Sequence, residues 1–458
     1  MDAELRLRPD TVSRSQHVVV QQHGIKGRIL VASKFFAEGD LLMWERPLLA
    51  VQPEASVECQ VILDMEGSWD CSYRYPGLFY WAALQSLSLS EEDQSLALQL
   101  HRPKGEAGED VRAVLEALGM DEGLEAMMED LLQIWIFNSL RSDDQLVLPL
   151  LMAMCSHDCS PNAFWSLHGE KIELRAGQDI SEGEEVTISY LGAGDLCLPS
   201  LERQRRLQVT KDFLCSCQRC SSLWDDVRVF VCPRCQGMAR AQKLATCVGP
   251  FVALGPTVEA TAETVSWSKL RGAVVELCSE TSEALQCDYC GPLGSVEAAA
   301  HLVPEAEFAQ LLQASTLSSV LGGIPLEASE GLGQEALPLL WRAQRCGLAA
   351  EHWVVEALRG YAAEEEIEQR PSLLRARCAA TGNTPRERLK RARLRVALAK
   401  AILQTASPSI SSMAEVTENL HLAREVLVHI FGASDPEVLE LEPLLAAEKG
   451  SENSCVGL

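Results

Sequence analysis

The feature that most constrains this chain is a group of three cysteines close together in the sequence: Cys215, Cys217 and Cys220. Three neighbouring thiols do not complete a tetrahedral zinc site, so they need a fourth sulfur from elsewhere. We take Cys159, well upstream, as that fourth ligand. Four thiolates leave no open position on the metal, so the predicted zinc is structural rather than catalytic. It would tie the segment that carries the three cysteines back onto the body of a domain.

Two Cys-x-x-Cys pairs predict a second zinc site of the ribbon type. The pairs are Cys232 with Cys235 and Cys287 with Cys290. The loop between them, about fifty residues, is longer than usual for such a site. Cys247 and Cys278 remain possible substitutes for one ligand. A thioredoxin-like redox pair is the competing interpretation, although no βαβ pattern surrounds either pair.

The cysteine content also bears on the compartment. The chain has 17 cysteines in 458 residues, and its first residues lack the apolar core of a signal peptide. We therefore expect a reducing, intracellular location, cytoplasmic, nuclear or both, where metal ligands are commoner than disulfides. No apolar run reaches the length of a membrane span, so no membrane association is expected.

Length and charge limit the possible partners. A chain of 458 residues predicts about two or three domains. Its net charge of -25 argues against direct nucleic-acid binding and favours basic partners such as lysine-rich proteins, although simple solubility explains the charge equally well. Nothing in the sequence requires a partner chain, so a monomer is expected.

The hydrophobic pattern changes along the chain. Residues 18–51 and 145–190 have the short apolar runs and turn signals of β structure, and a hairpin is expected in each. Between them, residues 79–137 carry apolar side chains at helical spacing. A helical insert between two β segments indicates one α+β domain assembled from pieces distant in sequence.

The last third of the chain follows a different pattern. Residues 221–300 carry cysteines and look irregular, whereas from about 301 leucine and alanine recur at helical spacing to the end. Asp435-Pro436 is typical of a helix cap followed by a first-turn proline. This region is expected to form stacked helical hairpins, without a strict internal repeat.

Three segments together resemble the signature of SET-domain lysine methyltransferases. They are HDCSPN at 157–162, GEEVTISY at 183–190 and FLCSCQRC at 213–220. Within that superfamily the chain most resembles the SET and MYND domain (SMYD) branch, over most of residues 18–445. The resemblance implies an α+β fold: a split SET domain of short β-sheets with a helical insert, a post-SET zinc site, and an all-α, TPR-like C-terminal domain.

The resemblance also implies a division into domains. The expected parts are the N-terminal part of the SET domain at 15–80, the helical insert at 81–137, the core SET at 138–195, the post-SET zinc segment at 196–222, a second zinc-knuckle region at 223–300 and the helical C-terminal domain at 301–450. Between the first hairpin and the insert only Cys59 and Cys71 occur. The MYND zinc finger of the family is therefore expected to be absent.

The activity implied by the resemblance is transfer of a methyl group from S-adenosyl-L-methionine to a lysine of a histone or another protein. Such a displacement needs mainly alignment of donor and neutral amine and exclusion of water. Tyr190 is the implied catalytic residue, with its hydroxyl beside the transferring methyl. Without the flanking signature, Tyr190 would be interpreted as a tyrosine at a strand end.

The cofactor contacts implied by the resemblance match the family pattern at some positions and depart from it at others. The residues are Lys26, Gly27, Arg28, Asn138, Ser156, His157, Tyr190 and Phe213. Ile29 stands where the family has the second glycine of a Gly-x-Gly turn, so this turn must differ, because a β-branched residue avoids positive φ. Ser156 replaces an asparagine and loses its paired donor and acceptor.

Each of these contacts has a plainer interpretation. Asn138 is nearly as well explained as a helix C-cap, His157 as a core histidine acting through its backbone and packing, and Phe213 as ordinary core. Two alternatives to an active methyltransferase follow. One is a catalytically weak SET-domain scaffold or regulator, motivated by Ser156 and Ile29; the other is a zinc-stabilised adaptor whose helical tail binds peptides.

Overall fold

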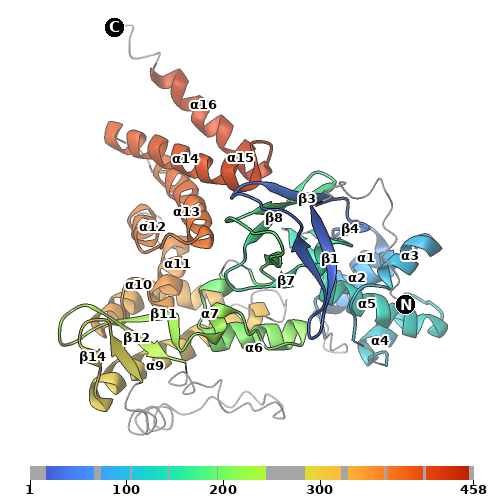
Figure 1. Ribbon diagram of the computed structural model, residues 1–458, viewed down its shortest axis with the longest axis horizontal. Coiled ribbons are helices and arrows are strands. Elements are labelled where there is room, and N and C mark those ends of the chain that lie inside the picture. The colour runs from blue at the N-terminus through green and yellow to red at the C-terminus, as the bar shows by residue number, and fades with distance from the viewer. Residues whose placement is uncertain are drawn as a thin grey trace.

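The structure is a computed structural model. It describes residues 17–66, 74–103, 106–142, 145–192, 194–243, 284–320, 328–365, 369–405 and 409–452. Within these ranges no helix combines the length and the apolar character that a membrane crossing requires. Short β-sheets occupy the centre of the molecule, with helices of the N-terminal half on one side and the long C-terminal helices on the other (Figure 1).

The described residues form five small sheets, whose strands are often distant in sequence. β1 (Val18–His23) pairs with β2 (Gly27–Ala32). β9 (Lys171–Ala176) lies between β3 (Leu41–Glu45) and β8 (Ala163–His168), and β6 (Gln145–Leu148) lies between β4 (Leu49–Val51) and β5 (Leu140–Ser142). The expected hairpins are confirmed as β1–β2 and β8–β9. β3 instead joins β9, so the first β segment is split between sheets.

The strand that leads toward Tyr190 is shorter than its sequence suggests. We expected β structure over 185–190, but strand geometry is confined to β10 (Thr187–Ile188), which pairs in parallel with β7 (Ser156–His157). Asn162 explains the short ladder, because its side chain takes over local backbone pairing. It donates to the carbonyl of Glu185 (2.9 Å) and accepts from the backbone N–H of Thr187 (2.8 Å).

The helical insert packs as a compact group. Its helices are α2 (Gly77–Ser86), α3 (Glu91–Ala97), α4 (Glu109–Ala117) and α5 (Glu125–Asn138), and an unexpected helix, α1 (Val57–Glu66), precedes them. Trp135 of α5 is fully buried, and its indole N–H donates to the hydroxyl of Ser86 at 2.8 Å. A buried tryptophan needs such a partner for its polar edge, and this contact fixes α5 against α2.

The region expected to be irregular contains a four-stranded antiparallel sheet. After α6 (Ser200–Lys211) and α7 (Gln218–Ser221), the strands are β11 (Trp224–Val231), β12 (Met238–Gln242), β13 (Leu285–Cys287) and β14 (Gly291–Pro292). The expectation was wrong because β11 buries charged residues that mask the strand pattern. Arg228 is buried and pairs with Glu305, with 2.5 Å between Nη2 and a carboxylate oxygen.

The C-terminal region is helical, as expected, but begins earlier. Its helices are α9 (Ser295–Val320), α10 (Ala328–Arg345), α11 (Trp353–Glu365), α12 (Arg370–Ala379), α13 (Pro385–Leu403), α14 (Ile410–Phe431), α15 (Pro436–Leu439) and α16 (Leu441–Glu452). Asp435 caps α15 by accepting from the N–H of Glu437 at 2.8 Å, which confirms the predicted cap. Asp435 also lies 3.3 Å from His168 of β8, so this helix end contacts the central sheets.

A buried carboxylate holds the loop that precedes β7. Glu45 is inaccessible to solvent, and its oxygens accept from the N–H groups of Leu150 (3.2 Å), Leu151 (3.0 Å) and Met152 (2.7 Å). Burial raises the pKa of Glu45 to about 7, while the three N–H groups oppose that shift. The contact joins β3 to the segment that leads into Cys155 and Ser156.

We expect Glu45→Gln to destabilise the protein by about 1–3 kcal/mol, because an amide offers one acceptor oxygen in place of two and leaves buried N–H groups unpaired. Denaturant unfolding followed by circular dichroism measures the change. Glu170→Gln, at the exposed turn between β8 and β9, is the matched control and should leave stability unchanged. Equal stability of the Glu45 variant and the wild type would contradict this role.

Candidate active site and metal centres

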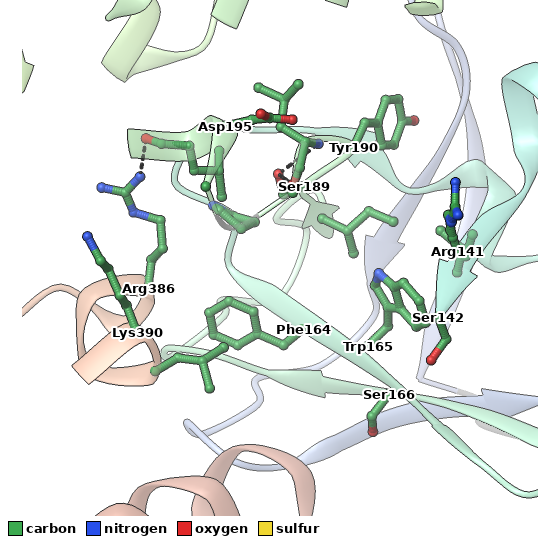
Figure 2. Close-up of a pocket in the computed structure, with 18 of the residues that line it drawn as sticks. Arg141, Ser142, Phe164, Trp165, Ser166, Ser189, Tyr190, Asp195, Arg386 and Lys390 are labelled. Atoms are coloured by element: carbon green, nitrogen blue, oxygen red, sulfur yellow. Dashed lines mark hydrogen bonds between the residues drawn. The ribbon is translucent and has the colours of Figure 1, made fainter. Parts of the chain in front are cut away.

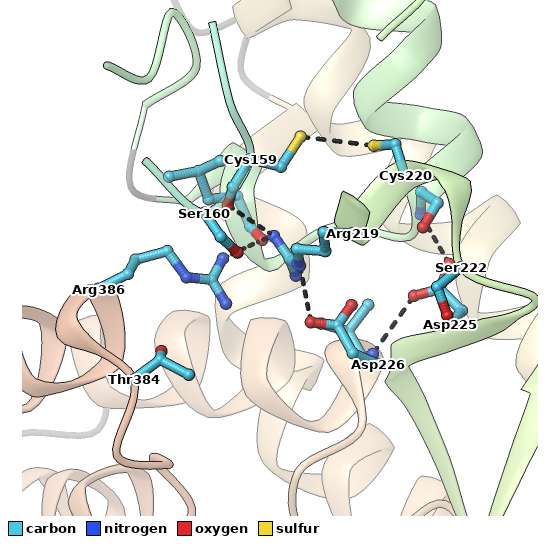
Figure 3. A network of polar contacts seen from close by, with 12 residues as sticks. Cys159, Ser160, Arg219, Cys220, Ser222, Asp225, Asp226, Thr384 and Arg386 are labelled. Carbon is cyan, nitrogen blue, oxygen red and sulfur yellow. Dashed lines mark hydrogen bonds and ion pairs between the residues drawn. The ribbon is translucent and has the colours of Figure 1, made fainter. Parts of the chain in front are cut away.

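The four sulfurs predicted for the first zinc site lie together. One sulfur atom each from Cys159, Cys215, Cys217 and Cys220 falls within 4.8 Å of the others. Cys159 follows β7, whereas the other three surround the short helix α7. The sulfurs of Cys159 and Cys220 are 3.5 Å apart and face each other in Figure 3. The site therefore joins the core of the central domain to a segment that follows α6.

A buried arginine supplies the charge that such a centre needs. Zn²⁺ with four thiolates carries a net charge of about −2, which is costly to bury without a cation nearby. Arg203 of α6 is inaccessible to solvent, and its Nη2 lies 3.6 Å from the sulfur of Cys220. Burial alone would lower the pKa of Arg203, but Cys220, Cys159 and Asp225 outweigh burial and raise it. These surroundings fit a charged zinc–thiolate centre better than four neutral thiols.

Arginines fasten this centre to the neighbouring parts of the molecule. Arg219 of α7 donates to the carbonyl of Leu196 at 2.8 Å and pairs with Asp226 of β11 at 2.6 Å (Figure 3). Arg386 of α13 donates to the same carbonyl at 2.6 Å. One backbone oxygen, that of Leu196, therefore links the segment before α6 to α7 and to the C-terminal helix α13.

The second predicted centre is also assembled. The sulfurs of Cys232, Cys235, Cys287 and Cys290 lie within 4.8 Å of one another, at the turns β11–β12 and β13–β14. Two knuckles at adjacent hairpin ends are typical of a zinc ribbon. Cys247, Cys278 and Cys71 lie outside the described residues. Cys59 is buried in α1 and belongs to neither cluster.

Tyr190 lies two residues beyond β10 at the wall of a large cavity. Its hydroxyl donates to the carbonyl of Cys155 at 2.6 Å, and its backbone N–H donates to Nδ1 of His157 at 3.0 Å. Burial raises the pKa of Tyr190, so the phenol stays protonated at neutral pH. The hydroxyl proton is used in the bond to the carbonyl of Cys155, so the lone pairs of the oxygen remain available to another group.

His157 connects Tyr190 to the first metal centre. Because Nδ1 accepts the N–H of Tyr190, the proton of the neutral ring is on Nε2, which lies 3.3 Å from the sulfur of Cys159. Burial lowers the pKa of His157 to about 4, so the ring is neutral near pH 7. A metal ligand and the implied catalytic tyrosine thus share one imidazole.

Phe213 completes a cluster of three rings. Its centroid lies 6.0 Å from His157 and 6.3 Å from Tyr190, and the latter two centroids are 5.4 Å apart. Phe213 is two residues before Cys215, so the zinc centre fixes where this ring lies. The structure therefore brings together Tyr190, His157 and Phe213 of the predicted cofactor set.

Lys26 and Ser156 both act on Glu185, a residue that the sequence interpretation missed. Glu185 accepts from Lys26 Nζ at 2.7 Å, and the side chain of Ser156 also helps to lower the pKa of this carboxyl. Burial alone would raise the pKa of Glu185, but these two partners lower it. The sequence signal that could have indicated Glu185 is the acidic pair Glu184-Glu185 just before β10. A charged residue beside a strand near a predicted site often pairs with a charge on a neighbouring segment.

The other predicted cofactor residues are more dispersed. Gly27 has a φ of +75°, and Ile29 continues β2, so the turn uses one glycine where the family has two. Arg28 donates to the carbonyl of Gln99 at 2.5 Å, on the helical insert. Asn138, the last residue of α5, donates its amide hydrogens to the carbonyls of His101 (2.7 Å) and Ile134 (2.8 Å). A ligand could therefore use only its side-chain oxygen.

The cavity, of about 1840 Å³, lies between the central sheets and the C-terminal helices. Phe164 and Trp165 of β8 form one wall, and Arg386 and Lys390 of α13 face them (Figure 2). Of the predicted site residues, Asn138 and Tyr190 line this cavity. The other predicted site residues, Lys26, Gly27, Arg28, Ser156, His157 and Phe213, are not among its lining.

Comparison with known families now identifies the central domain. The family model described as "SET domain" matches residues 27–191. This chain carries a SET domain. The match begins at the Gly27 turn and ends just after Tyr190, so it contains the split sheets, the helical insert and Cys159. The resemblance expected from the sequence motifs is confirmed.

Curated relatives match over a short part of the chain. N-lysine methyltransferase SMYD2 of Homo sapiens is 39% identical over 71 residues, 16% of this chain and 16% of the relative. Protein-lysine N-trimethyltransferase SMYD5 of Danio rerio is 40% identical over 82 residues, 17% and 19% of the two chains. Histone-lysine N-methyltransferase SET5 of Eremothecium gossypii is 38% identical over 72 residues, 16% and 14%. The chain thus matches less than a fifth of the length of these relatives.

Among solved structures, the SET domain of LSMT bound to lysine and AdoHcy is similar at a TM-score of 0.27 and 14% identity, with 95% of this chain and 90% of that chain covered.

We expect elemental analysis of the purified protein to find about two zinc ions per chain. Cys217→Ser and Cys235→Ser should each lose one ion, because each removes a ligand from a different centre. Cys378→Ser is the matched control, since Cys378 lies in neither centre, and it should keep both ions. Full zinc content in either ligand variant would refute that assignment.

Proposed function

We propose that this chain is an S-adenosylmethionine-dependent protein-lysine N-methyltransferase that acts on lysines of histones or other proteins. The observation that carries the proposal is the position of Tyr190 in the SET domain, with its hydroxyl oriented by Cys155 at the edge of a large cavity between that domain and the C-terminal helices. The similar proteins SMYD2, SMYD5 and SET5 are named as lysine methyltransferases, which supports the same reaction class.

The chain's residues suit methyl transfer by alignment rather than by covalent catalysis. S-adenosylmethionine supplies a methyl group on a cationic sulfur. The Tyr190 oxygen, held by its bond to Cys155, would stabilise the positive charge of the reacting methyl group. His157 contacts the sulfur of Cys159 and holds the backbone of Tyr190, so a zinc ion at the first centre would help to fix the position of Tyr190.

On the other side of Tyr190, the proposed donor site is lined by Phe213, His157, Ser156 and Lys26. The ring of Phe213 offers an apolar surface, and Lys26 offers a cation that Glu185 already holds in place. Ser156 helps to lower the pKa of the Glu185 carboxyl. Its single hydroxyl has less capacity to bind a donor than the amide of the family's asparagine would have.

The cavity on the near side is proposed to admit the acceptor lysine. Its C-terminal wall carries charges of both signs: Lys390 and Arg377 both pair with Glu356, at 2.8 and 3.0 Å, which leaves one positive charge in excess among these three groups. The net charge of -25 is therefore not concentrated at this wall. Selection of a protein substrate would depend on whether individual ion pairs of this wall separate, more than on the overall net charge of the chain.

The proposal predicts that Tyr190→Phe lowers methyl transfer about 100-fold or more, because the oriented oxygen is lost. Labelled-methyl transfer onto histones and onto a cell lysate measures the effect. Tyr289→Phe removes the same group from an exposed site on the zinc ribbon and should transfer normally. Equal rates for the wild type and Tyr190→Phe would refute the catalytic assignment.

Ser156→Asn should bind S-adenosylmethionine several-fold more tightly than the wild type, about 1 kcal/mol, because the amide restores a paired donor and acceptor. Isothermal titration calorimetry provides the measurement, with Ser160→Asn, in the exposed loop after Cys159, as the control. If the wild type binds the donor but modifies no protein in the lysate, the scaffold alternative replaces the enzyme.

A further inference from the structure

Of the two lysines that line the same cavity, Lys211 is the one that lies beside Tyr190. Lys211, the last residue of α6, is half-buried and lines the cavity together with Tyr190. Its Nζ donates to the carbonyl of Ile136 at 2.6 Å and lies 5.6 Å from the centroid of the Tyr190 ring. An amine of this chain therefore lies beside the residue to which the proposed function assigns the reaction.

The surroundings of Lys211 differ from those of other lysines. Lys26 and Lys390 pair with carboxylates at 2.7 and 2.8 Å. Lys211 has one backbone carbonyl and one aromatic face, and no carboxylate is among its recorded contacts in the described ranges. Burial without a counter-charge favours the neutral amine, and it lowers the pKa of Lys211 to about 8.

Other titratable groups near this amine stay in one form around that pH. Burial raises the pKa of both Tyr190 and Cys155, so the phenol and the thiol remain protonated. Glu185, whose charge acts on Tyr190, has a lowered pKa and stays ionised. From α5, Lys211 meets the uncharged carbonyl of Ile136. Glu45, whose charge acts on Cys155, completes its ionisation from a pKa of about 7, and the change in charge centred near pH 8 belongs to Lys211.

We propose that Lys211 is a methylation site of this chain, modified by its own SET domain. The inference rests on the proposed methyltransferase function and extends it to a second, internal acceptor. The side chain already lies in the cavity, so its transfer would be intramolecular, and tethering raises the effective concentration of the amine. The lysine side chain has four flexible methylene groups, so Nζ can break its hydrogen bond to the Ile136 carbonyl and rotate to another position beside Tyr190.

The step balances without a further reactant. The lone pair of neutral Nζ forms a bond to the methyl carbon of S-adenosylmethionine, and the carbon–sulfur bond breaks with its electrons on sulfur. S-adenosylhomocysteine leaves, and the new secondary ammonium releases one N–H proton to water to regenerate a neutral amine. The remaining hydrogen can still donate to Ile136, and the methylated cation, when protonated, still fits the Tyr190 face.

The test uses the full-length, zinc-loaded protein incubated with labelled S-adenosylmethionine and no other acceptor. We expect peptide mass spectrometry to find a methyl group on Lys211, at a first-order rate that does not change with protein concentration. The rate should rise about fivefold from pH 7 to pH 8 and about twofold more by pH 9, following the neutral fraction. Tyr190→Phe and Lys211→Arg should abolish the label, whereas Lys171→Arg, on β9, should keep it.

The outcomes separate the two claims. If lysate proteins are labelled but Lys211 of the wild type is not, the self-methylation inference fails and the methyltransferase function stands. If neither is labelled, the proposed function fails as well. A rate that rises with protein concentration overturns the intramolecular step. Mapping on the wild-type chain keeps the test decisive even if Lys211→Arg does not fold.

Discussion

The tie between Cys159 and the group Cys215, Cys217 and Cys220 is the constraint on which the rest of the site depends. It joins the loop after β7 to the segment between α6 and β11 that carries the short helix α7. Buried Arg203 offsets the charge of the sulfurs. The carbonyl of Leu196 accepts hydrogen bonds from Arg219 of α7 and from Arg386 of α13. The position of the C-terminal helices is thus coupled to the same centre.

The consequences of this tie reach the proposed chemistry through one imidazole. His157 faces the sulfur of Cys159 with Nε2 and holds the backbone of Tyr190 with Nδ1. Phe213 is fixed beside both rings because it lies two residues before Cys215. Loss of the first zinc would therefore disturb the orientation of Tyr190 and of the aromatic surface together, although neither residue is a ligand.

Much of the site was predictable because its signals are local. The cysteine spacings, the hairpins around 24–26 and 169–170, and the cap at Asp435 each depend on a few neighbouring residues. The sheet β11–β14 was missed for the opposite reason. Arg228 makes β11 look polar, and the partner that justifies its burial, Glu305, belongs to α9. Glu185 and Lys211 were overlooked in the same way, since their partners are distant in sequence.

The sequence by itself determined the chemistry that the chain can offer: eight thiols in two ligand sets, the SET motifs, and the tyrosine that follows them. Only the tertiary structure decided how these groups are used. It turned Ser156 and Lys26 toward a shared carboxylate, pointed Arg28 toward the helical insert, and placed Lys211 in the cavity. The physical reason is that a side chain's charge state and hydrogen bonds depend on burial and on partners far along the chain, which residue type and spacing do not specify.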